Sequence, residues 1–206
     1  MASRDTLLRR GRVLAAAGIV LGTGSALTLA SWSDATFTTG TFGVGSFGIE
    51  ASTDSGATWY QDENNLAFTV SAAAIRPGGT RYAPLSVRTE AGSLGALATL
   101  GGASSEGSVG LFNALRYRVV ETSTCDASAF SPAADYVVGD NSTRATLGTG
   151  SAPEAITLAA ATAAPGAARQ YCFELHLPDT TPNWTNPALP GSTARARWPL
   201  TASSTS

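Results

Sequence analysis

The residues of this sequence that could do chemistry are one histidine, two cysteines and a short acidic segment. His176 follows Glu174 by two positions, so in a strand both side chains would share one face and could form half of a metal or hydrolase site. A zinc peptidase needs three protein ligands and a general base. A serine hydrolase needs a nucleophile on a Gly-x-Ser-x-Gly turn, which the sequence lacks. We therefore expect His176 and Glu174 to be surface side chains of a strand, not catalytic groups.

The two cysteines are Cys125 and Cys172. An even number of cysteines outside the cell favours a disulfide, which would close a loop of about 47 residues and stabilise the fold by roughly 3 to 4 kcal/mol. The alternative is thiol catalysis, which needs a base beside the sulfur. The one histidine, His176, lies only four residues from Cys172, so we predict a structural disulfide.

A short acidic cluster consists of Asp54, Asp62, Glu63, Asn64 and Asn65. These oxygen ligands could hold Ca²⁺ outside the cell. They lack the alternating Asp-x-Asp-x-Asp-Gly spacing of a calcium loop, so we expect a solvated hairpin loop instead. No metal, cofactor or catalytic residue is predicted.

Three aromatic side chains lie in or beside expected loops: Trp59, Tyr60 and Trp184. Aromatic faces can stack on sugar rings, which makes these residues candidates for a ligand-binding surface. The alternative, which their residue types favour, is that they cover the open ends of the hydrophobic core. The sequence leaves both interpretations open.

The elements that position these groups are short strands. Runs rich in Thr, Val, Phe and Tyr recur between clusters of Gly, Pro, Asn and Asp, which is typical of an all-β protein. We predict a single β-sandwich, jelly-roll-like, with around eight to ten strands. The expected strands are 66–70, 82–89, 94–100, 115–120, 170–177 and 193–201, with a helical turn at 109–114. Residues 127–165 are expected to hold long loops, with weak strands at 136–138 and 156–158.

Two details of this pattern bear on the candidate residues. Alternation in 170–177 places four large apolar side chains on one face and Cys172, Glu174 and His176 on the other. Pro84 has no N–H for a strand ladder, so the start of strand 82–89 is expected at a sheet edge.

The first 30 residues have the three parts of a signal peptide: a cationic start, an uncharged apolar stretch at 13–29 and a small-x-small step that ends at Ala30. We expect a signal-peptide helix here, cleaved by a signal peptidase between Ala30 and Ser31. The chain would then be secreted as one domain, residues 31–206. The alternative is an uncleaved membrane anchor, because about 17 apolar residues are the lower limit for a span.

Charge limits the partners. Residues 1–30 hold four of the 13 basic and one of the 15 acidic residues, so nine positive and 14 negative charges remain, a net charge of about minus five. Nucleic acid is excluded as a partner, because phosphate binding needs a basic field.

Three short motifs carry a family resemblance: Trp32-Ser33-Asp34 with Thr36-Phe37-Thr38-Thr39-Gly40-Thr41, then Ile75-Arg76-Pro77-Gly78, then Gly92-Ser93-Leu94. Their order resembles the TasA/camelysin family of exported bacterial proteins, over about half of the mature chain. The resemblance implies a sandwich exported to the cell surface or matrix, where some relatives assemble into fibres. That family has also been labelled a metallopeptidase group, a label that the residues of this chain do not support.

Together these observations predict an exported, non-enzymatic structural protein of the cell surface or extracellular biofilm matrix. Its expected partners are other copies of itself or other matrix proteins. The candidate assembly strand is the mature N-terminal stretch 31–42, with Trp32, Asp34, Phe37, Gly40 and Phe42. The alternative is a secreted glycan-binding or ligand-binding module that uses the loop aromatics.

Overall fold

The structure is a computed structural model that describes residues 47–61, 66–71 and 75–205. The predicted signal-peptide helix, the domain boundary at residue 31 and the candidate assembly strand lie outside these residues. No helix in the described ranges is long and apolar enough to cross a membrane.

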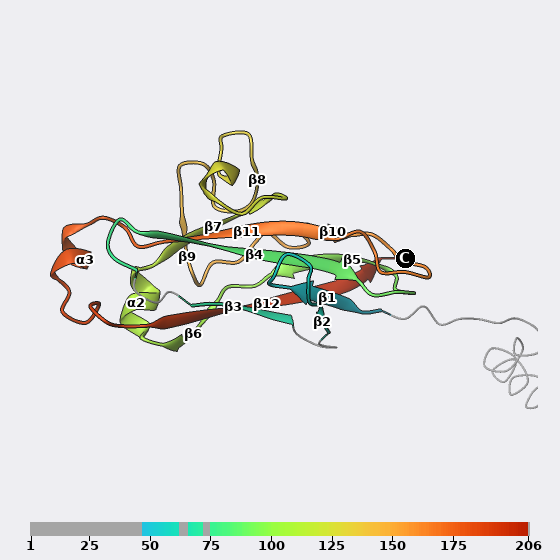
Figure 1. The fold of residues 1–206 in the computed structure, drawn as a ribbon, viewed down its shortest axis with the longest axis horizontal. Coiled ribbons are helices and arrows are strands. Elements are labelled where there is room, and N and C mark those ends of the chain that lie inside the picture. The colour runs from blue at the N-terminus through green and yellow to red at the C-terminus, as the bar shows by residue number, and fades with distance from the viewer. Residues whose placement is uncertain (1–46, 62–65, 72–74, 206) are drawn as a thin grey trace, which may run out of the picture. The chain divides into compact units, whose positions relative to one another are not determined.

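The described residues form two antiparallel sheets packed face to face, which confirms the predicted all-β sandwich (Figure 1). The strands are β1 (Ile49–Ser52), β2 (Tyr60–Gln61), β3 (Leu66–Ser71), β4 (Thr80–Thr89), β5 (Gly95–Leu100), β6 (Ser104–Gly107), β7 (Arg116–Glu121), β8 (Asp135–Val138), β9 (Ala145–Thr146), β10 (Ile156–Leu158), β11 (Arg169–His176) and β12 (Ala194–Thr205). The helices are α2 (Val109–Ala114), the single-turn 3-10 helix η1 (Ala127–Ala129) and α3 (Thr181–Thr185).

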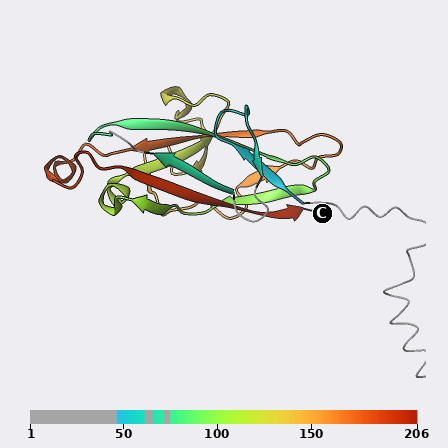
Figure 2. The same cartoon turned by 60° about the horizontal axis from the view of Figure 1, so that its bottom comes forward.

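The first sheet has the order β2-β1-β4-β11-β7-β8, with β9 beside β7, and the second has the order β10-β5-β12-β3, with β6 beside β12. The chain changes sheet repeatedly: β3, β5 and β12 belong to the second sheet, while β4, β7 and β11 belong to the first (Figure 2). The inward-facing hydrophobic side chains of the two sheets pack against each other and form the main core between the sheets.

Three aromatic rings join the sheets at the centre of the core. Tyr117 of β7 and Phe173 of β11 contact Trp198 of β12, with ring centroids 5.2 Å apart in both pairs. All three side chains are fully buried, and such aromatic pairs contribute about 0.5–1.5 kcal/mol beyond the area that they bury. Burial also raises the pKa of Tyr117 to about 12, and its hydroxyl donates to the backbone carbonyl of Thr149.

Part of the outer face of the first sheet, over β7 and β11, is covered. Residues 122–147, which we call the outer cover, run from the end of β7 through η1, β8 and β9; β8 and β9 pair with β7 at the sheet margin, while the η1 region with Phe130 packs on the outer face. They include part of the stretch that the sequence predicts as long loops. A second, smaller core forms beneath the cover from Val120, Phe130 and Cys172.

The start of β4 is an open sheet edge, as Pro84 predicts. β11 pairs with β4 along Thr80–Val87, whereas β1 reaches only as far as Ser86, its partner for Ser52. Within the described ranges, the half of β4 from Thr80 to Leu85 thus has a neighbouring strand on one side only. The outer side of β3 is a second open edge, because its described partner is β12 alone.

Candidate functional site

Glu174 and His176 lie on the outer face of β11, as the alternation predicts, but Glu174 is not a surface residue. Its side chain is 2% exposed. Arg118 of β7 donates from Nε and Nη2 to the two carboxylate oxygens, at 2.9 and 2.8 Å. Arg144 of the outer cover donates to Oε1 at 2.5 Å. The expectation of an exposed glutamate is wrong, because the outer cover folds over this part of β11 and brings Arg144 onto the carboxylate.

The surroundings of Glu174 keep it ionised. Burial raises its pKa, but the hydrogen bonds and charges of Arg118 and Arg144 outweigh burial and hold that pKa below its ordinary value. Both oxygens are already hydrogen-bonded to guanidinium groups. Glu174 is therefore an anchor for two arginines, and its carboxylate has no free oxygen with which to act as a general base.

His176 sits at the margin of the same cluster. Its Nδ1 lies 3.1 Å from the Thr80 hydroxyl. Burial lowers the pKa of His176, and the positive charge of Arg144 lowers it further. The ring is thus held neutral beside a hydroxyl and an arginine, and no second imidazole exists in the chain to complete a metal site.

Arg118 ties the outer cover to the sheet. Besides Glu174, it donates from Nη1 to the backbone carbonyls of Asp140 and Asn141. Its guanidinium carbon also lies 4.7 Å from the centroid of the Phe130 ring, within the range of a cation–π contact. Arg118 therefore neutralises the buried Glu174 carboxylate and also holds the backbone of the cover. The alternation of polar and apolar residues in the strand does not reveal this role.

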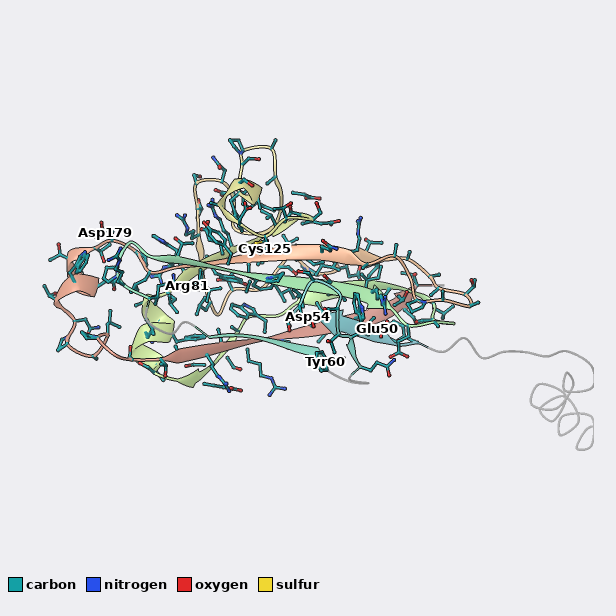
Figure 3. The ribbon with its side chains drawn as sticks, viewed as in Figure 1. Glu50, Asp54, Tyr60, Arg81, Cys125 and Asp179 are labelled. Atoms are coloured by element: carbon teal, nitrogen blue, oxygen red, sulfur yellow. A yellow bond between two sulfur atoms is a disulfide. The ribbon has the colours of Figure 1, made fainter. Side chains whose placement is uncertain are left out.

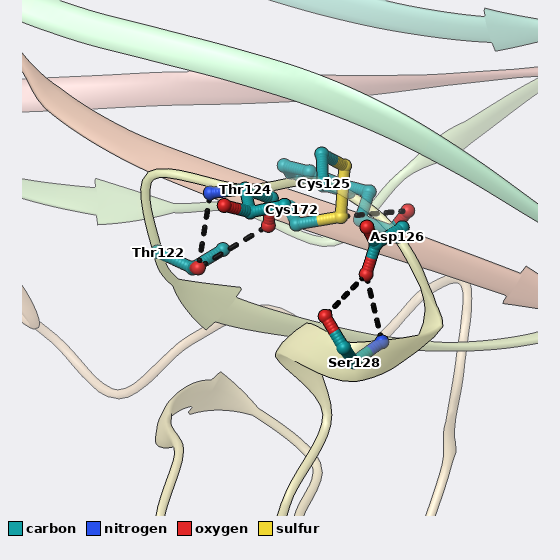
Figure 4. Close-up of a disulfide and its surroundings, with 7 residues drawn as sticks. Thr122, Thr124, Cys125, Asp126, Ser128 and Cys172 are labelled. Atoms are coloured by element: carbon teal, nitrogen blue, oxygen red, sulfur yellow. Dashed lines mark hydrogen bonds between the residues drawn. A yellow bond between two sulfur atoms is a disulfide. The ribbon is translucent and has the colours of Figure 1, made fainter.

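The predicted disulfide forms between Cys125 and Cys172 and joins the outer cover to β11 (Figure 4). Their Cα atoms lie 5.0 Å apart, and Cys172 is fully buried. Asp126, the next residue, accepts hydrogen bonds from the backbone N–H and hydroxyl of Ser128 and so begins η1. The bridge connects the exit of β7 with the start of β11, which is where the sequence predicts it.

The three candidate stacking aromatics do not form one surface. Tyr60 lies beside β1, whereas Asp179, which holds Trp184, lies at α3 (Figure 3). The α3 end of the sandwich is where β4 and β12 begin and β11 ends, and the β1 end is where β4 finishes. Two separate aromatic sites remain to be considered.

At the β1 end, the face of Trp59 is already occupied. The guanidinium of Arg88 lies 3.8 Å from its ring centroid, and Arg88 is held in turn by Glu50 at 2.5 Å. The indole N–H donates to the Gly56 carbonyl. Trp59 therefore stabilises this end instead of offering a stacking face, and its neighbour Tyr60 is 60% exposed.

At the α3 end, Trp184 is 60% exposed and borders a cavity of about 320 Å³. Its indole N–H donates to Asp179 Oδ1 at 2.5 Å, which fixes the orientation of the ring. Trp184 thus combines an exposed face with a neighbouring cavity. The sequence places Trp184 in or beside a loop, whereas in the structure it lies on the short helix α3.

The acidic cluster is described only at Asp54. That carboxylate accepts from the Ser52 hydroxyl at 2.6 Å and from the Thr58 backbone N–H at 2.9 Å. The Ser52 bond is the largest of the effects that lower its pKa to about 2. Asp54 thereby closes the turn before β2. Asp62, Glu63, Asn64 and Asn65 lie outside the described residues, and within the described ranges no three His, Cys, Asp or Glu side chains group as metal ligands.

The residues on which the family resemblance most depends, from Trp32 to Thr41, lie outside the described residues, as do Ala30 and Ser31 at the expected cleavage site. No family model matches the chain, and neither a curated protein nor a solved structure matches it.

Proposed function

We propose that this chain is an exported, non-enzymatic structural protein of the cell surface or extracellular matrix, and that its copies join through the mature N-terminal stretch 31–42. The outer edge of β3, which has no neighbouring strand within the described ranges, carries the assembly part of this proposal. An edge strand presents unpaired N–H and C=O groups, and an extended segment from another chain can pair with them.

The disulfide supports export. Bonds of this kind persist in oxidising compartments and are rare in the cytosol. The pair Cys125–Cys172 holds the outer cover at a buried position, so it has a structural place in the fold. The leader expected at residues 1–30 points to the same destination.

The engagement of Glu174 supports a non-enzymatic role. The pair of residues that the sequence singles out for hydrolysis is Glu174 and His176. Arg118 and Arg144 take both oxygens of the carboxylate, and the histidine contacts Thr80. These contacts hold the outer cover on the sheet, which is a structural use of potentially catalytic groups.

Several strands lie at sheet margins, but β2, β8 and β10 have only two to four residues. The longer edges of β4 and β3 differ in how readily they would accept another strand. On β4, Pro84 offers no N–H, and the exposed Arg81 adds a charge. Proline and charged side chains are the usual means by which edge strands avoid pairing. The sequence of β3, Leu66–Ser71, contains neither. We therefore assign β3 as the acceptor edge.

The first described residues of the chain, just before β1, are anchored to the sandwich. Gly48 is hydrogen-bonded to the turn after β4: its carbonyl accepts from the Glu90 N–H at 3.0 Å, and its N–H donates to the Ser93 hydroxyl at 3.1 Å. The stretch 31–42 precedes this anchor. Pairing with the β3 edge of another copy is a heterologous contact, and such contacts propagate into filaments unless they close into a ring.

A peptide of residues 31–42 tests the assembly step in trans. We expect excess peptide to occupy the β3 edge and slow the growth of assemblies followed by light scattering, while a scrambled peptide of the same composition has no effect. If both peptides slow assembly equally, pairing of residues 31–42 with the β3 edge is not sequence-specific and the proposal fails. The protein recovered from culture medium should begin at Ser31, and recovery only with Met1 retained would contradict export by cleavage.

A second candidate function is a secreted ligand-binding module. The observation that favours it is the exposed face of Trp184 beside a cavity at the α3 end. Such a site does not compete with the β3 edge, so both functions can reside in one chain.

A further inference from the structure

The cavity at the α3 end is built from three loops that are far apart in the sequence. The turn before β4, the end of β11 with α3, and the segment that leads into β12 meet there. Its lining residues are Ile75, Arg76, Pro77, Leu177, Asn183, Trp184, Leu189, Pro190, Gly191 and Ser192.

Hydrogen bonds within and between these loops fix the walls. Arg76–Gly79 forms a tight turn in which the Gly79 N–H donates to the Arg76 carbonyl at 2.7 Å and Gly78 has a φ of 80°. This conformation matches a type II turn, with proline second and glycine third. Leu177 bonds to both glycines of the turn, and Leu189 is 8% exposed and packs in the main core. A cavity with fixed walls loses little entropy when a ligand binds.

The hydrogen bonds made by Trp184 and Asn183 determine which of their groups remain available to a ligand. The Trp184 N–H is used by Asp179, so the indole can offer only the π face of its ring. A proline-rich peptide groove usually also uses such an N–H to bind a peptide carbonyl, whereas a sugar ring stacks on the face alone. Asn183 uses one N–H for the Pro178 carbonyl, which leaves its amide oxygen and second N–H for hydroxyl groups.

The charged side chains around the cavity indicate the charge of a ligand that would fit it. Arg76 is exposed and forms no ion pair with a described residue. Four further arginines without such a partner lie at the same end of the strands, namely Arg81, Arg116, Arg195 and Arg197. The carboxylates near them in the described strands and loops are already engaged or paired: Asp179 with Trp184, Glu106 opposite Arg195, and Glu174 with Arg118 and Arg144. The α3 end is therefore basic, although the mature chain as a whole is acidic.

We propose that this cavity binds a uronic acid residue of an acidic polysaccharide. The sugar ring stacks on Trp184, and the Arg76 guanidinium forms paired hydrogen bonds with the carboxylate, the geometry for which arginine is suited. The inference adds a ligand class to the second candidate function and does not depend on self-assembly. It would attach each copy to an anionic matrix polymer through the end of the sandwich that carries α3, opposite the end that carries β1 (Figure 1).

The test is calorimetric titration of the purified protein with trigalacturonate and with its carboxyl-reduced form, which is the same trisaccharide without charge. We expect the acidic form to bind at least about tenfold more tightly, the difference that one good charged pair supplies. Arg76→Gln should remove that preference and leave the weak binding of the reduced form. Equal binding of both forms by the original protein would overturn the proposal.

Variants of the ring separate stacking from fold effects. Trp184→Ala should weaken trigalacturonate binding about tenfold or more, while Trp184→Phe, which keeps a flat face, should retain most of it. Tyr60→Ala, an equally exposed aromatic at the β1 end, is the matched control and should bind normally. Loss of binding in Tyr60→Ala, or unchanged binding in Trp184→Ala, would contradict the assignment.

Two other occupants of the cavity have distinct signatures. If no saccharide binds but Arg76→Glu alters self-association in sedimentation, the cavity is an interface between copies and the sugar proposal fails. If the polymer binds but trigalacturonate does not, and binding follows Arg195→Gln and Arg197→Gln instead of Trp184→Ala, the end is a diffuse polyanion surface without a sugar site. Either result would leave the proposed pairing at β3 untouched.

Discussion

Arg118 and Glu174 lie directly opposite each other in the register of β7 and β11, and two guanidinium–carboxylate hydrogen bonds join them beneath the outer cover. The pair is almost completely buried, with side-chain exposures of 9% and 2%. Burying such a charged pair costs desolvation free energy. Removing one partner leaves the other charge buried and unpaired, which lowers the free energy of unfolding.

Glu174→Gln should destabilise the protein by about 3 kcal/mol or more, because two arginines would remain near a group that no longer carries a charge. Urea denaturation measures this change. Glu121→Gln is the matched control: Glu121 pairs with Arg169, but their side chains are 26% and 47% exposed, so the expected loss is below about 1 kcal/mol. Equal losses in the two variants would show that burial does not govern the energetics of these pairs.

The same carboxylate predicts an acid limit to stability. Because the folded-state pKa of Glu174 is held below its ordinary value, the unfolded chain binds its proton first as pH falls. The contribution of Glu174 is therefore complete above about pH 4.3, the ordinary pKa of glutamate, and is lost as pH falls towards the folded-state pKa. Free energies of unfolding measured from pH 6 to pH 2.5 should decline more steeply in the original protein than in Glu174→Gln. Parallel curves would contradict this.

His176 gives a second, independent pH signal. Since the chain has one histidine, its imidazole resonances can be followed by NMR without assignment. Burial and the charge of Arg144 lower its pKa, so the titration midpoint should lie below about 6.5, the ordinary value. Protonation of the unfolded chain then costs stability as pH falls below that value. A midpoint at or above 6.5 would mean that Glu174 and not Arg144 dominates the field at the ring.

The disulfide should contribute substantially to stability. The double variant Cys125→Ala with Cys172→Ala opens a loop whose ends are 47 residues apart, and a loss of about 2–4 kcal/mol is expected. Urea denaturation with and without dithiothreitol checks this, since the reductant should weaken the original protein and leave the variant unchanged. A difference within about 0.5 kcal/mol, the range of a neutral surface substitution, would contradict the prediction.

The strands that alternate strongly could be read from the sequence, because their two faces differ in polarity. The face of β11 that holds Phe173 is buried in the main core, and the face that holds Cys172 is the opposite one, as the alternation predicts. The helical turn α2 and the strands β8 and β10 also agree with the expected positions. The local pattern of polar and apolar residues predicts a strand where one of its faces packs in the core and the other does not.

The outer cover could not be read in the same way. Its segment is rich in small residues and has little pattern, and what holds it is long-range: the disulfide, and Arg118 and Arg144 on Glu174. Such contacts pair residues 30 and 56 positions apart, so no local window contains them. The same reason explains β6 (Ser104–Gly107), which is not among the strands expected from the sequence. It becomes a strand because Ala194–Arg197 lies beside it.

The cavity at the α3 end also depends on distant segments. Trp184 was singled out from its residue type, but Arg76 and Leu189, which help to enclose the cavity, lie 108 positions before it and five after it in the chain. Helix α3 was missed because Pro182 and the neighbouring Pro178 and Pro187 are typical of a connector. Proline is in fact tolerated in the first turn of a helix, where it stands here.

The central claim, assembly through the mature N-terminal stretch, is tested most directly by sedimentation velocity on two forms of the chain, residues 31–206 and residues 43–206, over a wide range of concentration. The account predicts that the longer form assembles into growing species that electron microscopy shows as fibres, while the shorter form stays monomeric with an unchanged unfolding transition. Identical monomeric behaviour of both forms, or identical assembly of both, would contradict it.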